Sequence, residues 1–296
     1  MINQQKIALL TDSCADIPQA LVRRYDIYVV PLKLIFSDGE CADGVDITPT
    51  EVYRRLPQEI PKTTLPGGDM VEQAFARIQQ AGYTKVLAIN LSGGLSGTGN
   101  LVRLMGEQIV GLEVAAFDTL SGSLGIGMTV IQAARWIEEG WSWSELLRAM
   151  PALIRDTHVF FCVDTLEYLR KGGRIGKIAA VAGTLLQIKP IISFAPDGEL
   201  TSVAKIRGRK AAMQKMVQLA TALVPRGVPF NLAVAHGDSP AELKEIREMA
   251  QKSLPDYLHL MEGEIDCTLG AYVGPHLLGV GVQMLSEALS AAGKEN

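Results

Sequence analysis

Short apolar runs alternate with longer amphipathic segments through the first half of the chain. We predict strands at KIALLTD, IYVVPLKLIF, TKVLAIN and EVAAFDT, and most of them are separated by stretches of helical periodicity such as GDMVEQAFARIQQAG. Strands that alternate with helices in this way form a parallel sheet covered by helices. The predicted fold class of this half is therefore α/β, with a Rossmann-like parallel sheet and flanking helices.

The predicted helices have recognisable ends. Thr48, Ser142 and Ser239 each stand three residues before a glutamate, which is the capping-box pattern of a helix start. Gly82 and Gly140 follow amphipathic stretches and are suitable helix stops, because glycine readily adopts the left-handed conformation found there. These signals support the helices predicted between the strands.

The pattern changes in the second half, after Pro151, where we expect a helix to be broken. We predict strands at HVFFCVD, KPIISF, ELTSVAKI, PFNLAVAHG and YLHLMEGEI, and the turn sequence PDG joins the second to the third. Two successive strands joined by a turn predict a mixed or antiparallel sheet. We therefore predict two tightly packed domains with a cleft between them, an N-terminal α/β domain over 1–155 and a C-terminal mixed α/β domain over 156–296.

Composition and charge limit the class of protein. The chain has 296 residues, of which 48% are hydrophobic, so it can bury the cores of two domains. Its formal net charge of −4 leaves no broad basic surface, so we expect no nucleic-acid partner. No run approaches the roughly 20 apolar residues of a membrane span, and the apolar run near the start is too short for a secretory signal.

The four cysteines, Cys14, Cys41, Cys162 and Cys267, lie far apart and form no CxxC pair. Their spacing does not match a cysteine-based zinc motif, and it favours free thiols over a disulfide framework. Free thiols are typical of a reducing compartment. We therefore expect a cytoplasmic protein.

Small polar residues and glycines follow three of the predicted strands, in the sequences TDS, LSGG and DTLS. Ligands of a parallel α/β sheet collect at the carboxyl ends of its strands, and glycine lets backbone N–H groups approach an anion closely. The loop LSGGLSGT is therefore a candidate cradle for a carboxylate or a phosphate. The same residue types are common in turns and helix caps, so that alternative stays open for each loop.

Other chemistries have weaker support in the sequence. GGRIGKI does not have Walker spacing, and no GxGxxG follows a strand, so nucleotide binding lacks its usual motifs. A serine nucleophile in these loops would need a base, and His158 is the first histidine, while His236 and His276 could reach the loops only across domains. Asp12 and Asp118, at strand ends, could hold a magnesium ion together or could brace their loops.

Six stretches resemble, in order, the signature blocks of the DegV family: TDSCADIP, TTLPG, LSGGLSGT, DTLSGSLGIG, LEYLRKGGRIG and LLQIKPIISFAPDGEL. The resemblance covers most of the chain. It implies a two-domain α/β protein that buries one long-chain fatty acid, with the carboxylate near the domain junction and the tail in an apolar tunnel. It also implies a protein without catalytic residues, metal or cofactor that presents the acid to a separate ATP-dependent fatty acid kinase, which forms the acyl phosphate.

The family's site residues can be carried onto matching positions. Its carboxylate-binding threonine falls on Thr63, and its serine-rich loop supplies Ser92, Gly93 and Ser96, with Gly93 standing where the family has a second serine. Tyr272 stands where the family has a histidine. Both departures change the donors available to a head group, and we expect the phenol of Tyr272 to take over the role of the histidine.

For contact with the kinase, the resemblance suggests Arg174, in the basic turn KGGRI, and Arg207. Two further classes of function stay open. One is a metal-dependent hydrolase or phosphotransferase that uses Asp12 and Asp118, and the other is a binding protein for another small anion.

Overall fold

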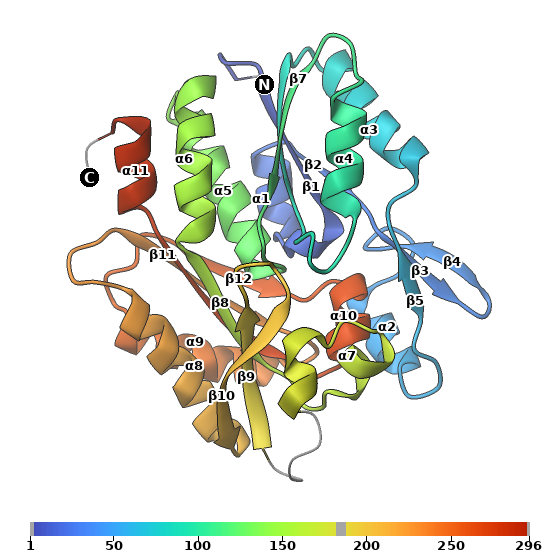
Figure 1. Cartoon of the computed structure of the whole chain (residues 1–296), viewed down its shortest axis with the longest axis vertical. Coiled ribbons are helices and arrows are strands. Elements are labelled where there is room, and N and C mark those ends of the chain that lie inside the picture. Colours follow the sequence, from blue (N-terminus) through green and yellow to red (C-terminus); the bar gives the residue numbers. More distant parts are fainter. Residues whose placement is uncertain (1–2, 182–187, 295–296) are drawn as a thin grey trace.

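The computed structural model of the chain describes residues 3–181 and 188–294. Within these ranges the first half forms a four-stranded, all-parallel sheet in the order β2-β1-β6-β7 (Figure 1). Its strands are β1 (Ile7–Asp12), β2 (Ile27–Val30), β6 (Lys85–Asn90) and β7 (Glu113–Asp118). The predicted parallel N-terminal sheet is confirmed.

Helices cover both faces of this sheet. On one face α3 and α4 place Phe75 and Val102 against Leu10 and Val86, and α5 packs on the other face. Gly82 and Gly140 follow α3 and α5 with positive φ angles, as predicted. The helical elements of this half are η1 (Ser13–Ala15), α1 (Gln19–Arg24), α2 (Pro49–Arg55), α3 (Gly68–Gln80), α4 (Thr98–Gly106), α5 (Leu124–Glu138) and α6 (Trp143–Arg155).

The second half forms a six-stranded mixed sheet in the order β10-β9-β8-β13-β11-β12, in which only β11 and β12 pair in parallel. The predicted mixed sheet is confirmed, and so is the hairpin over PDG. Its strands are β8 (Thr157–Cys162), β9 (Ile188–Phe194), β10 (Leu200–Arg207), β11 (Phe230–His236), β12 (Leu260–Glu264) and β13 (Leu278–Met284). Residues 185–187 of the block LLQIKPIISFAPDGEL lie outside the described residues.

The helices of the second half are α7 (Glu167–Lys171), η2 (Gly176–Val181), α8 (Arg209–Leu223), α9 (Pro240–Ser253), α10 (Cys267–Val273) and α11 (Ser286–Ala292). Apolar residues of α8 and α9, including Met216 and Ile246, bury one face of the six-stranded sheet, and α5 packs on the opposite face. The sheet is therefore covered on both sides.

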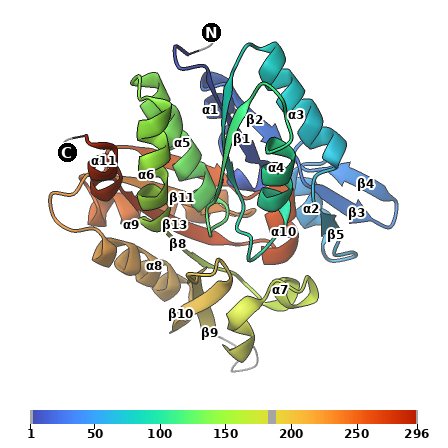
Figure 2. The same ribbon diagram turned by 45° about the horizontal axis from the view of Figure 1, so that its top comes forward.

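A third, antiparallel sheet of order β4-β3-β5 was not predicted. Its strands are β3 (Lys33–Phe36), β4 (Gly39–Ala42) and β5 (Lys62–Thr64). The run at 27–36, predicted as one strand, is two strands in different sheets, because Pro31 between them has no N–H to donate to a ladder. We call residues 33–64 the bridging segment: they leave the first sheet and pack, through Leu34 and Tyr53, against α10 of the second half (Figure 2).

Two expected features of the helices differ in the structure. α6 continues through Pro151, because burial of Leu146, Met150 and Leu153 on its apolar face outweighs the hydrogen bond that the proline removes. The helix starts predicted at Thr48, Ser142 and Ser239 are confirmed. Thr48 and Ser142 form complete capping boxes, but the side chain of Ser239 caps no backbone N–H of α9.

Helix α5 joins the two sheets. All of its residues except Arg135 and Glu138 are buried, and it contacts β1 and β6 of the first sheet as well as β8, β11 and β13 of the second. One hydrophobic core therefore includes residues from both halves. The domain boundary between α6 and β8, at residue 155, stays a prediction.

Gly127 lets α5 approach the loop after β1, since a Cβ at this position would lie 2.4 Å from the carbonyl oxygen of Ala15. We expect Gly127→Ala to lower the free energy of unfolding by about 1 kcal/mol, because overpacking costs roughly 1–3 kcal/mol and better helix propensity returns about 1. Urea denaturation measures the change. The control Gly68→Ala, in open space at the start of α3, should not destabilise, and equal effects at both positions would contradict the close approach.

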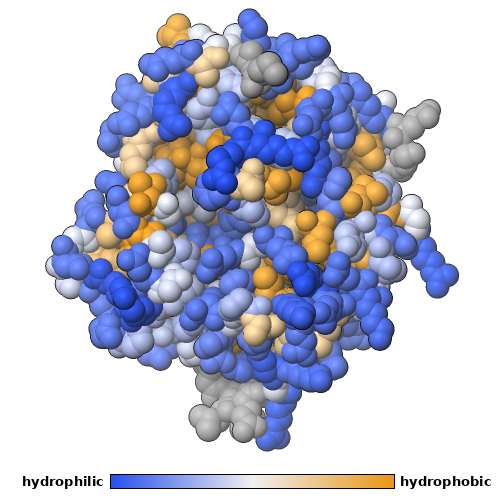
Figure 3. Space-filling model, turned by 180° about the vertical axis from the view of Figure 1, so that it is seen from behind, coloured by the Kyte–Doolittle hydropathy of each residue, from blue (hydrophilic) through white to orange (hydrophobic). Residues whose placement is uncertain are grey.

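The surface is mostly hydrophilic, with apolar side chains gathered in separate areas (Figure 3). In the part of the chain that the structure describes, no helix is both long and apolar enough to cross a membrane. All four cysteines are free, as predicted.

Candidate functional site

A pocket of about 300 Å³ lies between the two larger sheets and the bridging segment. This volume is at the lower end of the range of roughly 300–1,000 Å³ that is typical of small-molecule sites. Residues from both predicted domains line it. They are Leu32, Thr63, Thr64, Leu65, Leu91, Leu95, Ser96, Gly97, Gly122, Ser123, Leu124, Val159, Phe161, Leu169, Arg174, Phe194, Leu200, Ala235, Ile265, Thr268, Leu269, Tyr272, Val273, Leu277 and Gly279.

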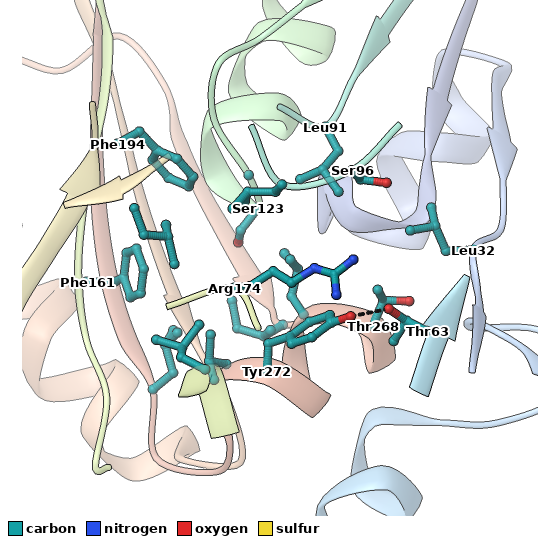
Figure 4. A pocket seen from close by; sticks show the side chains of 18 of the residues that line it. Leu32, Thr63, Leu91, Ser96, Ser123, Phe161, Arg174, Phe194, Thr268 and Tyr272 are labelled. Atoms are coloured by element: carbon teal, nitrogen blue, oxygen red, sulfur yellow. Dashed lines mark hydrogen bonds between the residues drawn. The ribbon is translucent and has the colours of Figure 1, made fainter. Parts of the chain in front are cut away.

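One end of the pocket is apolar and the other is polar. Figure 4 shows Phe161 and Phe194 on one side of the pocket, with Thr63, Thr268 and Tyr272 on the other. Most of the remaining wall is formed by leucine, isoleucine and valine side chains or by glycine. The pocket therefore matches an amphiphile with one polar end.

At the polar end the hydroxyls of Thr63 and Tyr272, 209 residues apart in the chain, form a hydrogen bond (Figure 4). Thr63 lies on β5, and the bridging segment reaches α10, which carries Tyr272, through its apolar contacts with that helix. Because one hydroxyl of the pair donates to the other, one proton remains for a ligand.

Arg174 supplies positive charge at this end. Its guanidinium carbon lies 5.1 Å from the centre of the Tyr272 ring, a cation–π distance, and its Nη1 donates to the carbonyl oxygen of Gly172 over 2.9 Å. Arg174 follows α7 and is exposed on one side. An anionic head group beside Thr63 and Tyr272 would therefore lie near a cation.

The pocket opens at its polar end. The exposed residues of its lining are Thr64, Leu65, Gly97 and Arg174, whereas the apolar end is buried apart from Phe194, which is half-buried. A ligand would therefore place its polar group near the opening and its apolar part inside.

Comparison with known proteins decides the family. A family model described as "Uncharacterised protein, DegV family" matches residues 6–284. The chain belongs to the DegV family. It is 36% identical, over 94% of its length and 99% of the relative, to a DegV domain-containing protein of Clostridium perfringens.

Solved structures of DegV proteins have the same fold. A fatty-acid-binding DegV protein of Thermus thermophilus is 30% identical, with a TM-score of 0.88 over 94% of this chain and 99% of that one. A stearic-acid-binding protein of Eubacterium ventriosum is 26% identical, with a TM-score of 0.87 over 96% and 100% of the two chains. The two-domain DegV architecture predicted from the sequence is confirmed at the level of fold.

The structure brings together only some of the residues carried over from the DegV motifs. Thr63, Ser96 and Tyr272 line the pocket, whereas Ser92 and Gly93 do not. The buried hydroxyl of Ser92 donates to the carbonyl oxygen of Gly198 over 2.9 Å. This hydrogen bond connects the loop after β6 to the β9–β10 turn. The roles of these residues in ligand binding stay predictions.

The other candidate residues have different surroundings. The N–H of Gly93 donates to Asp118 Oδ2 over 3.0 Å, so this N–H is engaged with the end of β7. Arg207 lies on β10, outside the pocket lining, whereas Arg174, predicted to contact a partner, lines the pocket.

The two histidines considered as catalytic bases, His236 and His276, also lie outside the pocket lining. The Nδ1 atom of each forms a hydrogen bond with Ser239.

The two strand-end aspartates brace backbone loops. Asp12 accepts hydrogen bonds from the N–H groups of Cys14 and Leu91, at 3.1 and 2.8 Å, and Asp118 Oδ1 accepts from the N–H of Leu120 at 2.8 Å. Burial raises the pKa of Asp12 to about 6. In residues 3–181 and 188–294 no group of histidine, cysteine, aspartate and glutamate side chains is arranged to hold a metal ion.

Sequence reasoning missed Thr268. This residue lies on α10 four positions before Tyr272, so the two share a helix face, and its N–H donates to Asp43 Oδ2 over 3.1 Å. Its buried hydroxyl has no hydrogen-bond partner among the described residues. The spacing of four was the available signal, but it has meaning only once the stretch is known to be helical.

Proposed function

We propose that this DegV protein binds one long-chain fatty acid in the pocket, with the carboxylate beside Thr63, Tyr272 and Arg174. The observation that carries the proposal is a largely apolar pocket with an arginine and a pair of hydroxyls at its open end. A buried carboxylate needs such partners, since leaving a charge unpaired away from water is costly. The related fatty-acid-binding protein of Thermus thermophilus and stearic-acid-binding protein of Eubacterium ventriosum support this choice of ligand.

We further propose that the protein presents the bound carboxylate to a separate fatty acid kinase, which forms the acyl phosphate with ATP in the cytoplasm. The position of the polar end at the opening supports this role, because a partner could reach the carboxylate without displacing the tail. Arg174 and Arg207 are the residues proposed to contact the kinase.

A binding role also accounts for the strand-end carboxylates better than catalysis of its own does. Asp12 and Asp118 accept hydrogen bonds from backbone N–H groups of the loops after β1, β6 and β7, so both carboxylates already have a structural role. The metal-dependent hydrolase or phosphotransferase therefore has less support than a lipid carrier.

Organic-solvent extraction of the purified protein followed by mass spectrometry tests the ligand. We expect close to one fatty acid per chain, and we expect delipidated protein to rebind a fluorescent fatty acid. A protein that carries no lipid and takes up none would refute the proposal. A lipid-loaded protein that yields no acyl phosphate with a fatty acid kinase and ATP would refute the presenting role alone.

The hydroxyl pair gives a test of the head-group end. We expect Tyr272→Phe and Thr63→Val each to raise the dissociation constant of the acid about tenfold, the worth of a hydrogen bond to a charged group. The double variant should raise the dissociation constant little more than either single change does, because removing either hydroxyl also removes the hydrogen bond that orients the other. Tyr257→Phe, outside the pocket lining, is the control. Fully additive losses would mean that the hydroxyls act independently.

A further inference from the structure

Two aromatic rings line the apolar end of the pocket. Phe194, at the end of β9, lines the pocket next to Phe161 of β8, and their ring centres are 6.2 Å apart at an angle of 46°. On its other side the ring lies close to the loop before α5, since a Cβ added at Gly122 would be 3.4 Å from Phe194 Cζ. The Phe194 ring therefore occupies the space between the second sheet and this loop.

Phe194 differs from its neighbours in exposure. Leu91, Phe161 and Leu200, which line the same end, are buried, whereas Phe194 is half-buried. Part of the Phe194 side chain is therefore accessible at the pocket. Figure 4 shows the ring at the side of the pocket opposite Thr63 and Tyr272.

We propose that Phe194 is the stop that sets the longest acyl chain the pocket accepts. This inference rests on the proposed function and extends it to the length of the acid. With the carboxylate held at the open end, each added methylene moves the tail terminus toward Phe194. Each buried methylene raises affinity about fourfold, and the gain ends where the tail meets the ring.

Removing the ring should lengthen the pocket. In Phe194→Ala the space of the ring joins the pocket and is bordered by the apolar side chains of Leu91, Phe161 and Leu200. Phe194→Leu should free a smaller space and cause a smaller shift. The two variants therefore form a graded series, which protects the test if the alanine variant folds poorly.

The experiment measures dissociation constants of delipidated protein for saturated straight-chain acids, each two methylenes longer than the last, by displacement of a fluorescent fatty acid. For the natural protein we expect affinity to rise with length and then stop rising. For Phe194→Leu and Phe194→Ala we expect the same rise per methylene to continue to longer acids. Circular dichroism melting confirms that each variant is folded.

Leu65→Ala is the matched control, because Leu65 lines the pocket at its opening and not at the tail end. It should change affinity for all lengths by a similar factor and leave the length limit in place. An unchanged limit in both folded Phe194 variants, or an equal shift in Leu65→Ala, would overturn the inference. Failure of the natural protein to bind any acid would instead overturn the proposed function, and the length limit with it.

Discussion

Replacing Arg174 with methionine is expected to raise the dissociation constant for a long-chain fatty acid about tenfold to a hundredfold. Methionine keeps an apolar stem over the Tyr272 ring but removes the guanidinium, which is the positive charge at the polar end of the pocket. The carboxylate then loses its charged partner, while burial of the tail is unchanged. Displacement of a fluorescent fatty acid measures the loss.

Arg170→Met provides the control for this prediction. Arg170 lies on α7, four residues before Arg174, and it is exposed and outside the pocket lining. The Arg170→Met variant should bind the acid with the same affinity as the natural protein.

Salt dependence gives a second measurement. The affinity of the natural protein for the acid should fall as the salt concentration rises, because Arg174 is exposed on one side. Arg174→Met should lose most of this salt dependence. Unchanged affinity in Arg174→Met would restrict this residue to partner contact.

The position of Arg174 shows where motif reasoning stopped. From the sequence it was a cation in a basic turn, which suggested contact with a partner. Its place in the pocket follows from the position of α7 next to α10, which brings the turn over Tyr272. No local pattern in KGGRI contains that information, because the contact depends on the packing of two helices about a hundred residues apart.

The sheets were largely predictable, because strand periodicity and turn residues act locally. Two parts of the sheets were predicted incorrectly, and in both cases proline or glycine residues are the cause. Pro31 divides an apolar run between two sheets, and β13 was missed because Gly279 and Gly281 weaken its strand pattern. Gly281 also lies close to α5, since a Cβ there would be 3.0 Å from Met128 Sδ.

The polar end of the pocket was predictable only in part. Thr63 and Tyr272 were each proposed from the resemblance, but their mutual hydrogen bond depends on the bridging segment, which crosses from the first sheet to α10. Long-range contacts of this kind arise from burial of Leu34 and Tyr53 against the helix, a tertiary effect without a sequence period.

Stability is expected to fall as pH rises from about 4 to about 7, because several carboxyl groups are buried where the first sheet meets α10. Burial raises the pKa of Asp12 from 3.8 to about 6. It also raises the pKa of Asp16 and of Asp266, and for Asp266 the charges of Asp43 and Asp16 add to the effect of burial. Asp16 Oδ1 accepts from the backbone N–H of Asp266 over 2.8 Å, so the two residues lie side by side.

The sign follows from proton linkage. A carboxyl group whose pKa is higher in the folded state binds its proton more tightly there, so it stabilises the fold below its unfolded pKa. That stabilisation is lost as pH rises through the folded pKa. For Asp12 the difference between 3.8 and about 6 corresponds to about 3 kcal/mol lost between these pH values. Asp16 and Asp266 act in the same direction.

Asp266→Asn isolates one member of this group. Asp266 caps α10 by accepting from the N–H of Leu269 over 2.8 Å, and asparagine can make the same hydrogen bond. At pH 4 the variant should be about as stable as the natural protein, because the buried carboxyl is then neutral. At pH 8 the variant should be the more stable, because it removes a buried acid that must either ionise next to Asp16 and Asp43 or hold its proton at a cost. Urea unfolding from pH 4 to pH 8 measures both curves, and parallel curves would show that Asp266 ionises as readily in the folded chain as in the unfolded one.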